Sequence, residues 1–214
     1  MDAGQWVIIG LCVILGLWFV AGHLSNGRKV RRVSRAAEAA LTKYGRVSGI
    51  RRLGNSGAQF IVERAEIPFR QIEMVFLLEG RENPLLWFFE RIRGRRDELV
   101  LRANLRTAPT QEISLAESRD REFKARILGE QEKPYEWIAA PTGLEMARRG
   151  AKDTAMVERL KRFLEDSGLA VRRLSIQSKE PHLTVRVRLF TDGILSIEAL
   201  LEAIRNVVQR SAPG

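Results

Sequence analysis

Few residues in this chain have the types and spacing that catalysis or metal binding would need. The two histidines, His23 and His182, are far apart, and neither lies at a metal-ligand spacing from the single cysteine, Cys12. Acidic residues are neighbours at 97–98 and 165–166, but adjacent side chains in a strand face opposite ways, and those at a helix end are ordinary solvated charges. No nucleophile elbow, P-loop or dinucleotide fingerprint is present. We therefore expect no catalytic residue, metal site or cofactor, although an active site assembled from distant Asp, Glu and Arg residues would leave no such motif.

The chemistry that the sequence does offer is the binding of negative charge. The net charge is +10, and residues 26–55 hold nine Lys and Arg residues against a single acid, Glu38. A nucleic-acid-binding protein should carry its basic patch on the folded domain, so we expect no nucleic-acid partner. Each Lys or Arg near an anionic membrane contributes about 1 kcal/mol of attraction. Five basic residues are expected to contact anionic lipid: Arg28, Lys29, Arg31, Arg32 and Arg35.

The element that would position these basic residues is the uncharged segment 3–22. At about 1.5 Å per residue, a helix of this length covers roughly 30 Å, which is the hydrocarbon thickness of a bilayer. The sequence therefore predicts a single transmembrane helix over residues 1–23. Its membrane-spanning side chains are expected to be Trp6, Val7, Ile8, Ile9, Leu11, Val13, Ile14, Leu15, Leu17, Trp18, Phe19 and Val20.

The charges that flank this segment predict its orientation. The N-terminal side carries Asp2 and no basic side chain, whereas the other side carries the basic run. By the positive-inside rule, the N-terminus lies outside the cell membrane and the C-terminal domain is cytoplasmic. A cleaved signal peptide is the alternative, with small residues at 20–22, but a signal peptide begins with positive charge. A buried core helix of a soluble protein also has this composition, and the basic flank disfavours it.

Residues 24–45 are expected to form a second, basic juxtamembrane helix after a turn at 25–27. Apolar residues recur at steps of three and four: Val30, Val33, Ala37, Ala40 and Tyr44. A heptad seam of this kind can join two chains, which would give a homodimer through residues 30–44. Two heptads are fewer than a coiled coil usually needs, and alanine is a weak core residue, which counts against the dimer.

Residues 83–94 are expected to form a short amphipathic helix. Asn83 suits the cap, Pro84 suits the first turn, and Gly94 suits the exit. Large apolar residues backed by arginines are typical of a helix that lies in the membrane interface. The alternative is that the rings pack on the domain's own sheet, as in most amphipathic helices. The residues concerned are Leu85, Trp87, Phe88, Phe89, Arg91, Ile92, Arg93, Arg95 and Arg96.

The remaining chain alternates with a period of two and predicts strands at 46–53, 58–63, 71–79, 98–105, 111–115 and 121–128. Residues 129–153 are expected to be irregular. A helix at 154–166, strands at 169–176 and 182–190, and a helix at 196–209 would then form a helix–strand–strand–helix unit. The fold class is therefore α+β: one transmembrane helix, then a mostly antiparallel β domain. A β-rich part, 46–135, and a C-terminal part, 136–214, are expected to pack as one domain.

Three functions fit these features. The first is a non-enzymatic, single-pass membrane protein whose cytoplasmic domain binds or scaffolds an unknown protein partner. The second is a recognition module for anionic lipid headgroups, formed by the basic run and residues 83–96. The third is a membrane-tethered enzyme whose active site is not visible in the sequence.

Overall fold

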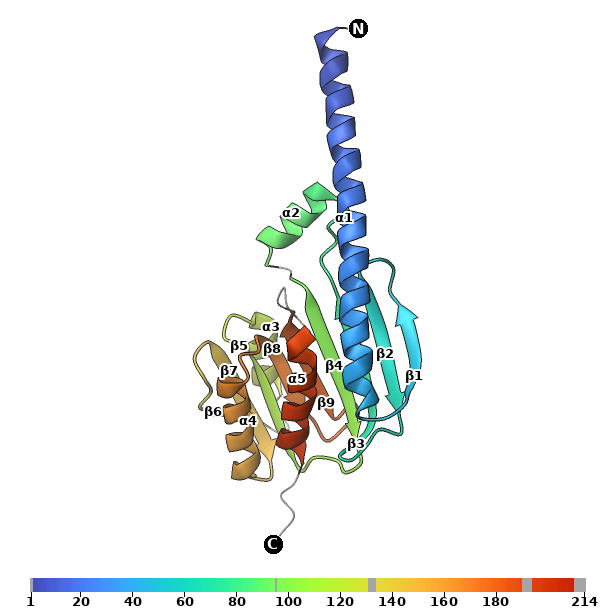
Figure 1. Cartoon of the computed structure of the whole chain (residues 1–214). Helices are drawn as coiled ribbons and strands as arrows, with labels where there is room; N and C mark the ends of the chain where they lie inside the picture. Colours follow the sequence, from blue (N-terminus) through green and yellow to red (C-terminus); the bar gives the residue numbers. More distant parts are fainter. Residues whose placement is uncertain (1, 95, 131–133, 190–193, 210–214) are drawn as a thin grey trace.

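A nine-stranded antiparallel sheet, in the order β1-β2-β3-β4-β9-β8-β5-β7-β6, forms the body of the protein (Figure 1). This is a computed structural model, which describes residues 2–94, 96–130, 134–189 and 194–209. One long N-terminal helix, α1, projects beyond the sheet. The α+β class expected from the sequence is confirmed.

Helix α1 runs without interruption over Ala3–Thr42, so the turn expected at 25–27 is wrong. It begins with a capping box, in which Asp2 and Gln5 exchange side-chain and backbone hydrogen bonds. Asn26, which suggests a turn, is buried in the helix, and its Nδ2 donates to the Glu79 carbonyl oxygen at 3.0 Å. Asn26 therefore joins α1 to the segment before α2, and it does not form a turn.

The first half of α1 is long and apolar enough to cross a membrane, which makes it a candidate transmembrane helix. Only 6% of its most apolar 18-residue window is buried, whereas the core helix of a soluble protein would be mostly buried. The twelve large apolar side chains predicted to face lipid are all exposed. Most of the apolar segment is therefore not packed against the described part of the chain.

The second half of α1 packs along the sheet beside α5 (Ile194–Val208). Val30, Val33, Ala37 and Ala40 are buried there, and Tyr44 just beyond the helix packs edge-on against Phe69 at 5.9 Å. The seam with heptad spacing is thus covered by the chain's own domain. These side chains are therefore not exposed for contact with a second copy of the chain.

The first four strands form an antiparallel meander, and the hairpin expected at residues 54–57 is confirmed. The connection from β3 to β4 carries a short helix, α2 (Pro84–Ile92). The strands are β1 (Val47–Arg52), β2 (Gly57–Glu63), β3 (Phe69–Leu77) and β4 (Glu98–Leu105).

The C-terminal strands continue the same sheet, because β9 pairs with β4. One apolar core accordingly contains side chains from both halves of the chain, such as Phe76 and Val185. The strands are β5 (Gln111–Glu117), β6 (Glu136–Ile138), β7 (Leu144–Gly150), β8 (Val171–Ile176) and β9 (Leu183–Arg188).

Two sequence-based expectations fail in this half. Residues 121–128 form a helix, α3 (Arg121–Gly129), rather than a strand. Asp120 caps it, and Phe123 and Ile127 share its buried side four residues apart, while Ala125 is exposed. Residues 129–153 include β6 and β7, although residues 131–133 lie outside the described part of the chain. Strand β7 buries only Met146 and Ala147, which is too weak a pattern to predict from alternation.

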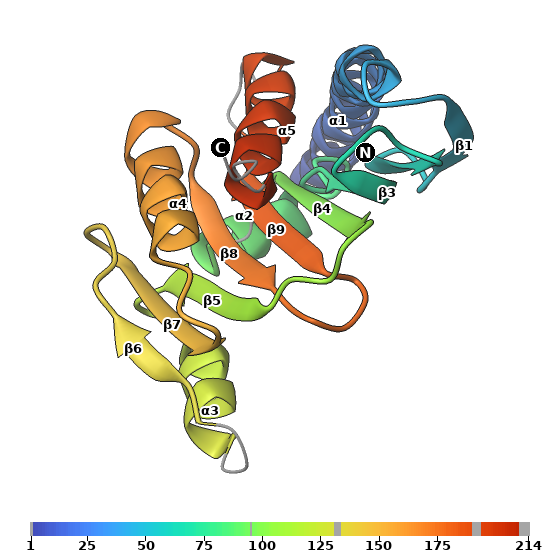
Figure 2. The same cartoon turned by 90° about the horizontal axis from the view of Figure 1, so that it is seen from below.

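The helices divide unequally between the two faces of the sheet. The lower part of α1, α4 (Thr154–Asp166) and α5 cover one face, and α3 lies on the other (Figure 2). The helix–strand–strand–helix unit expected at the C-terminus is present as α4, β8, β9 and α5, although residue 190 at the end of the expected strand is not described. Away from α3, the second face carries polar side chains and no helix among the described residues.

A close backbone contact joins α1 to the chain before α2. A Cβ on Gly22 would lie 2.7 Å from the carbonyl carbon of Arg81, whereas one on Gly16 would meet nothing within 4 Å. The contact therefore requires glycine at position 22.

We expect Gly22→Ala to lower the free energy of unfolding by about 1–3 kcal/mol, because the segment at Arg81 must move. Gly16→Ala is the matched control and should leave stability unchanged or slightly higher. Thermal unfolding of both variants in detergent measures the difference. Equal melting temperatures for the two variants would show that the contact does not hold α2 in place.

Candidate functional site

Helix α2 forms as its sequence predicts. The Asn83 side chain accepts a hydrogen bond from the Leu86 amide at 3.1 Å, and Pro84 occupies the first turn. Gly94 has a φ of +77°, a conformation that ends the helix at low cost for glycine. The local signals thus define where the helix lies, but not which side of it faces the domain.

The apolar side of α2 faces away from the domain. None of its residues is buried. The expectation that these rings pack on the sheet is therefore not what the structure shows. The exposed fractions are 69% for Leu85, 53% for Leu86, 57% for Phe88, 58% for Phe89 and 67% for Ile92.

The inner side of α2 is held by polar contacts instead. The Trp87 indole Nε1 donates to Glu79 Oε2 at 2.8 Å, and Arg91 Nη1 lies 3.6 Å from the same oxygen. The Arg91 guanidinium also stacks over the Trp87 ring, 5.2 Å from its centroid. Only 3% of the Glu79 side chain is exposed, so this carboxylate is desolvated and depends on these partners.

A second buried carboxylate extends this cluster to α1. Asp97 Oδ1 accepts from the Glu79 amide at 2.6 Å, while Oδ2 forms ion pairs with Lys29 and with Arg81, the latter at 3.2 Å. We call the following set the polar cluster: Asn26, Lys29, Glu79, Arg81, Trp87, Arg91, Arg96 and Asp97. It joins α1, the segment before α2, α2 itself and the start of β4.

Helix α2 meets α1 where the apolar segment of α1 ends. The Trp18 indole Nε1 donates to the Arg81 carbonyl oxygen at 3.1 Å, and the Trp18 and Trp87 rings lie 6.1 Å apart. One turn further along, His23 Nδ1 lies 3.3 Å from Glu82 Oε1. The exposed apolar side of α2 is therefore level with residues 18–23 of α1, the expected end of the span.

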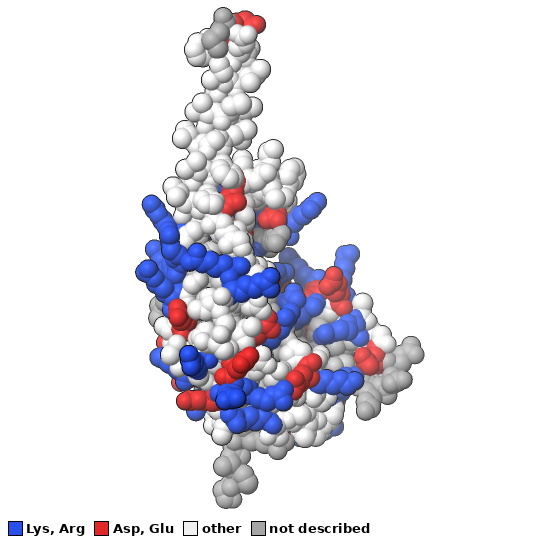
Figure 3. Space-filling model, turned by 90° about the vertical axis from the view of Figure 1, so that its right-hand side faces the viewer, with Lys and Arg blue, Asp and Glu red and all other residues white. Residues whose placement is uncertain are grey.

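Four of the five basic residues predicted to contact lipid remain exposed on α1. Arg28, Arg31, Arg32 and Arg35 line one shallow groove along the helix. Figure 3 shows a band of Lys and Arg below the uncharged upper helix. Lys29 is the exception: it is turned inward onto Asp97 and only 17% of its side chain is exposed, so it is not part of the surface that the four arginines form.

The arginines in and after α2 also differ in whether they have an acidic partner. Arg93 is exposed, whereas Arg91 and Arg96 pair with Glu79. Arg95 lies outside the described residues. Two of the arginines predicted to form a basic surface are therefore paired with a buried carboxylate of the domain.

Other polar groups with partners inside the fold have structural roles. His182 is buried, and its Nδ1 accepts from the Leu105 amide at 3.0 Å. Burial alone would raise the pKa of Glu112, but hydrogen bonds from Ser178 and Arg149 outweigh it and hold the pKa below its ordinary value. Among the described residues, no group of three His, Cys, Asp or Glu side chains could hold a metal ion.

The polar face of the sheet could not be recognised from the sequence. Along β9, Arg186 and Arg188 alternate with buried valines, as on any half-exposed strand. Asp120 pairs with Arg173 at 2.6 Å; burial opposes its ionisation, but this pair and the Phe123 amide lower the pKa of Asp120 overall. Only the register of several strands brings these side chains together.

No protein-family model matches the sequence, and no curated protein shows significant similarity to it.

The polar cluster should be essential to stability. We expect Asp97→Asn to lower the free energy of unfolding by about 3 kcal/mol or more, because it leaves the charge of Lys29 buried without a counter-ion. Urea unfolding of the detergent-solubilised chain, followed by circular dichroism, measures this loss.

The matched control is Glu73→Gln, which removes an acid from a more exposed pair with Arg102 at 3.7 Å. Pairs of that kind contribute less than about 1 kcal/mol. Equal effects of the two substitutions would show that the cluster is no more important than a surface ion pair.

Proposed function

We propose that the protein is a membrane-anchored binding protein in which α1 spans the bilayer and α2 lies in the adjacent interface. The observation that carries this proposal is the exposed apolar side of α2, level with Trp18 near the end of the apolar segment of α1. Burying a Leu, Ile or Phe side chain contributes about 1.5–3 kcal/mol, so five exposed ones favour an apolar phase strongly. The tether raises the effective concentration of that phase further.

The lipid interface is the occupant that the charges favour. The exposed Arg28, Arg31, Arg32 and Arg35 lie on α1 just beyond residue 22, on the domain side. Trp18 comes first and the arginines follow it on the domain side, which is the order of residues expected across a membrane boundary. In this arrangement the N-terminus is outside and the sheet domain is cytoplasmic.

Two contacts with the membrane would hold the domain in one orientation. A single helix leaves a domain free to rotate about its axis, whereas a second helix placed by the polar cluster restricts that rotation. We infer that the domain binds a protein partner at the membrane surface in a defined orientation. Because the seam at Val30, Val33, Ala37 and Ala40 is covered by the domain, the partner would bind elsewhere than on that seam.

Recognition of anionic lipid is the second candidate function. The groove lined by Arg28, Arg31, Arg32 and Arg35 favours it, since four exposed guanidinium groups on one helix face can bind several headgroup phosphates. Lys29 contributes nothing to that surface.

Docking of α2 can be measured by spin labelling. In a Cys12→Ala background reconstituted into lipid nanodiscs, we expect a nitroxide on Phe88→Cys to be relaxed by dissolved oxygen and shielded from a water-soluble nickel complex. Lys179→Cys, on an exposed turn between β8 and β9, is the control and should show the opposite preference. Equal nickel accessibility at the two positions would sink the docking proposal.

The orientation can be tested with the same control variant. We expect a membrane-impermeant maleimide to leave Lys179→Cys unmodified in intact cells and to modify it after lysis, because the sheet domain is cytoplasmic. Modification in intact cells would reverse the proposed topology, whatever the result for α2.

A further inference from the structure

The face of the sheet opposite α1, α4 and α5 is uncovered from β3 to β8 among the described residues. The strand register aligns two rows of side chains across it. One row is Glu73, Arg102, Thr184 and Ser175, and the next is Val75, Val100, Arg186 and Arg173. Strands far apart in the sequence therefore build one polar surface.

This surface is hollowed by two adjoining depressions, of about 620 Å³ and about 470 Å³. Arg173 and Arg186 line both, so the two depressions adjoin, and we call the pair the open-face trough. Its floor and walls include Arg102, Arg126, Arg173, Ser175, Thr184 and Arg186. The volume is in the range of small-molecule sites, but the lining is polar, which suits a polar ligand.

Most arginines on this face have an acidic partner. Arg102 lies 3.7 Å from Glu73, Arg173 lies 2.6 Å from Asp120, and Arg188 lies 2.7 Å from Glu117. Such pairing is ordinary on a solvated sheet surface, and by itself indicates no ligand.

Arg186 and Arg126 depart from this pattern. Within the described ranges, neither has an acidic partner within 4 Å, and both are exposed in the trough. Arg186 also lies directly opposite Arg173 on the neighbouring strand, where like charges repel. Arg126 comes from α3, with its guanidinium 6.0 Å over the Phe123 ring. Two elements thus direct unpaired positive charge into one groove.

Neutral hydrogen-bond donors accompany these charges. Ser175 is only 8% exposed, and its hydroxyl has no partner among the described residues. Thr184 lies beside it on β9, and its side chain also lines the trough. The depressions are also lined by carboxylates, but each of these has an arginine within 4.0 Å: Glu73, Glu98, Glu117, Asp120, Glu122 and Glu180. The charges of Arg186 and Arg126 therefore remain unbalanced among the described residues, which favours a ligand with several acceptor oxygens and negative charge. Guanidinium groups bind phosphate oxygens in pairs, in a planar geometry that lysine cannot provide.

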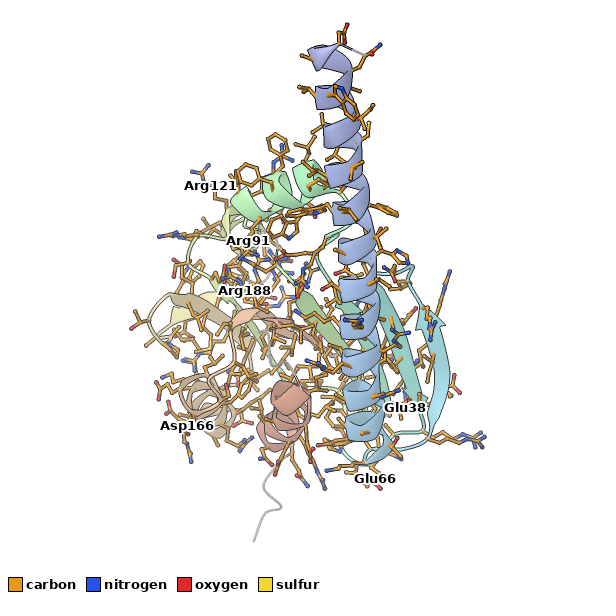
Figure 4. All side chains as sticks on the ribbon, turned by 45° about the horizontal axis from the view of Figure 1, so that its top comes forward. Glu38, Glu66, Arg91, Arg121, Asp166 and Arg188 are labelled. Atoms are coloured by element: carbon orange, nitrogen blue, oxygen red, sulfur yellow. The ribbon has the colours of Figure 1, made fainter. Side chains whose placement is uncertain are left out.

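We propose that the open-face trough binds a phosphate-bearing ligand, contacted first by Arg186 and Arg126. Its end nearest α2 is lined by Glu98 at the start of β4 and by Arg121 on α3, which is labelled in Figure 4. A phosphate could therefore reach it from solution or from a lipid headgroup. This site stands on the register and charges of the sheet, independently of how α2 meets the membrane.

Inorganic pyrophosphate is the soluble probe. With the full chain in phosphatidylcholine nanodiscs at constant ionic strength, we expect saturable binding by isothermal titration calorimetry, weakened at least tenfold by Arg186→Gln. Arg51→Gln is the matched control: it removes the same charge from an exposed position on β1, outside the trough. Absence of saturable binding, or equal weakening by both substitutions, would overturn the proposal.

A second arm identifies the source of the phosphate. The titration is repeated in nanodiscs that contain phosphatidic acid. If a lipid headgroup occupies the trough, the apparent affinity for pyrophosphate should fall severalfold in the wild-type chain and not in Arg186→Gln. An unchanged wild-type affinity assigns the trough to a soluble phosphate compound. Thermal unfolding of both variants within about two degrees of wild type ensures that any loss reflects the site.

Discussion

Two carboxylates buried side by side, Glu79 and Asp97, constrain the arrangement of everything near the apolar segment. Desolvated carboxylates are costly unless cations and hydrogen-bond donors surround them. Here the cations come from four parts of the chain: Lys29 from α1, Arg81 from the segment before α2, Arg91 from α2, and Arg96 from the segment before β4. None of these elements can move far without leaving a buried charge unpaired. The polar cluster therefore couples the direction of α1, the position of α2 and the start of β4.

This constraint also explains why the apolar side of α2 faces away from the domain. A surface helix normally buries its apolar stripe on the core and exposes its charges. In α2, Trp87 and Arg91 are committed to Glu79 on the inner side, so Phe88, Phe89 and Ile92 must face outward. In water this would be an unfavourable exposure of apolar surface. It becomes favourable only in an apolar phase at that level, and the apolar half of α1 extends into the same region.

The sequence was sufficient for the elements that local rules define. The cap at Asn83, the hairpin at 54–57 and the strand at 98–105 all depend on nearby residues, and the structure has them. The segment 121–128 was predicted to be a strand but is a helix. Phe123 and Ile127, four residues apart, fit the spacing of a strand and of a helix equally well. Only the cap at Asp120 distinguishes the two. Periodicity grouped the apolar residues of α2 correctly but could not say which way they point. That direction depends on Glu79 and Asp97, and the partner of Asp97, Lys29, is 68 residues away in sequence.

The open-face trough could not be predicted from the sequence either, because its residues come from strands that are far apart in the chain. Each arginine in β8 and β9 looks like the solvent side of an ordinary strand, and no single strand indicates a site. Pairing β8 with β9 places Arg173 opposite Arg186, and the helix at 121–129, which was expected to be a strand, brings Arg126 to the same groove. Like charges in register destabilise a sheet unless something neutralises them. Arg173 has Asp120 for this purpose and Arg186 has no counterpart among the described residues, so the charge balance of the sheet itself favours an anion at that position.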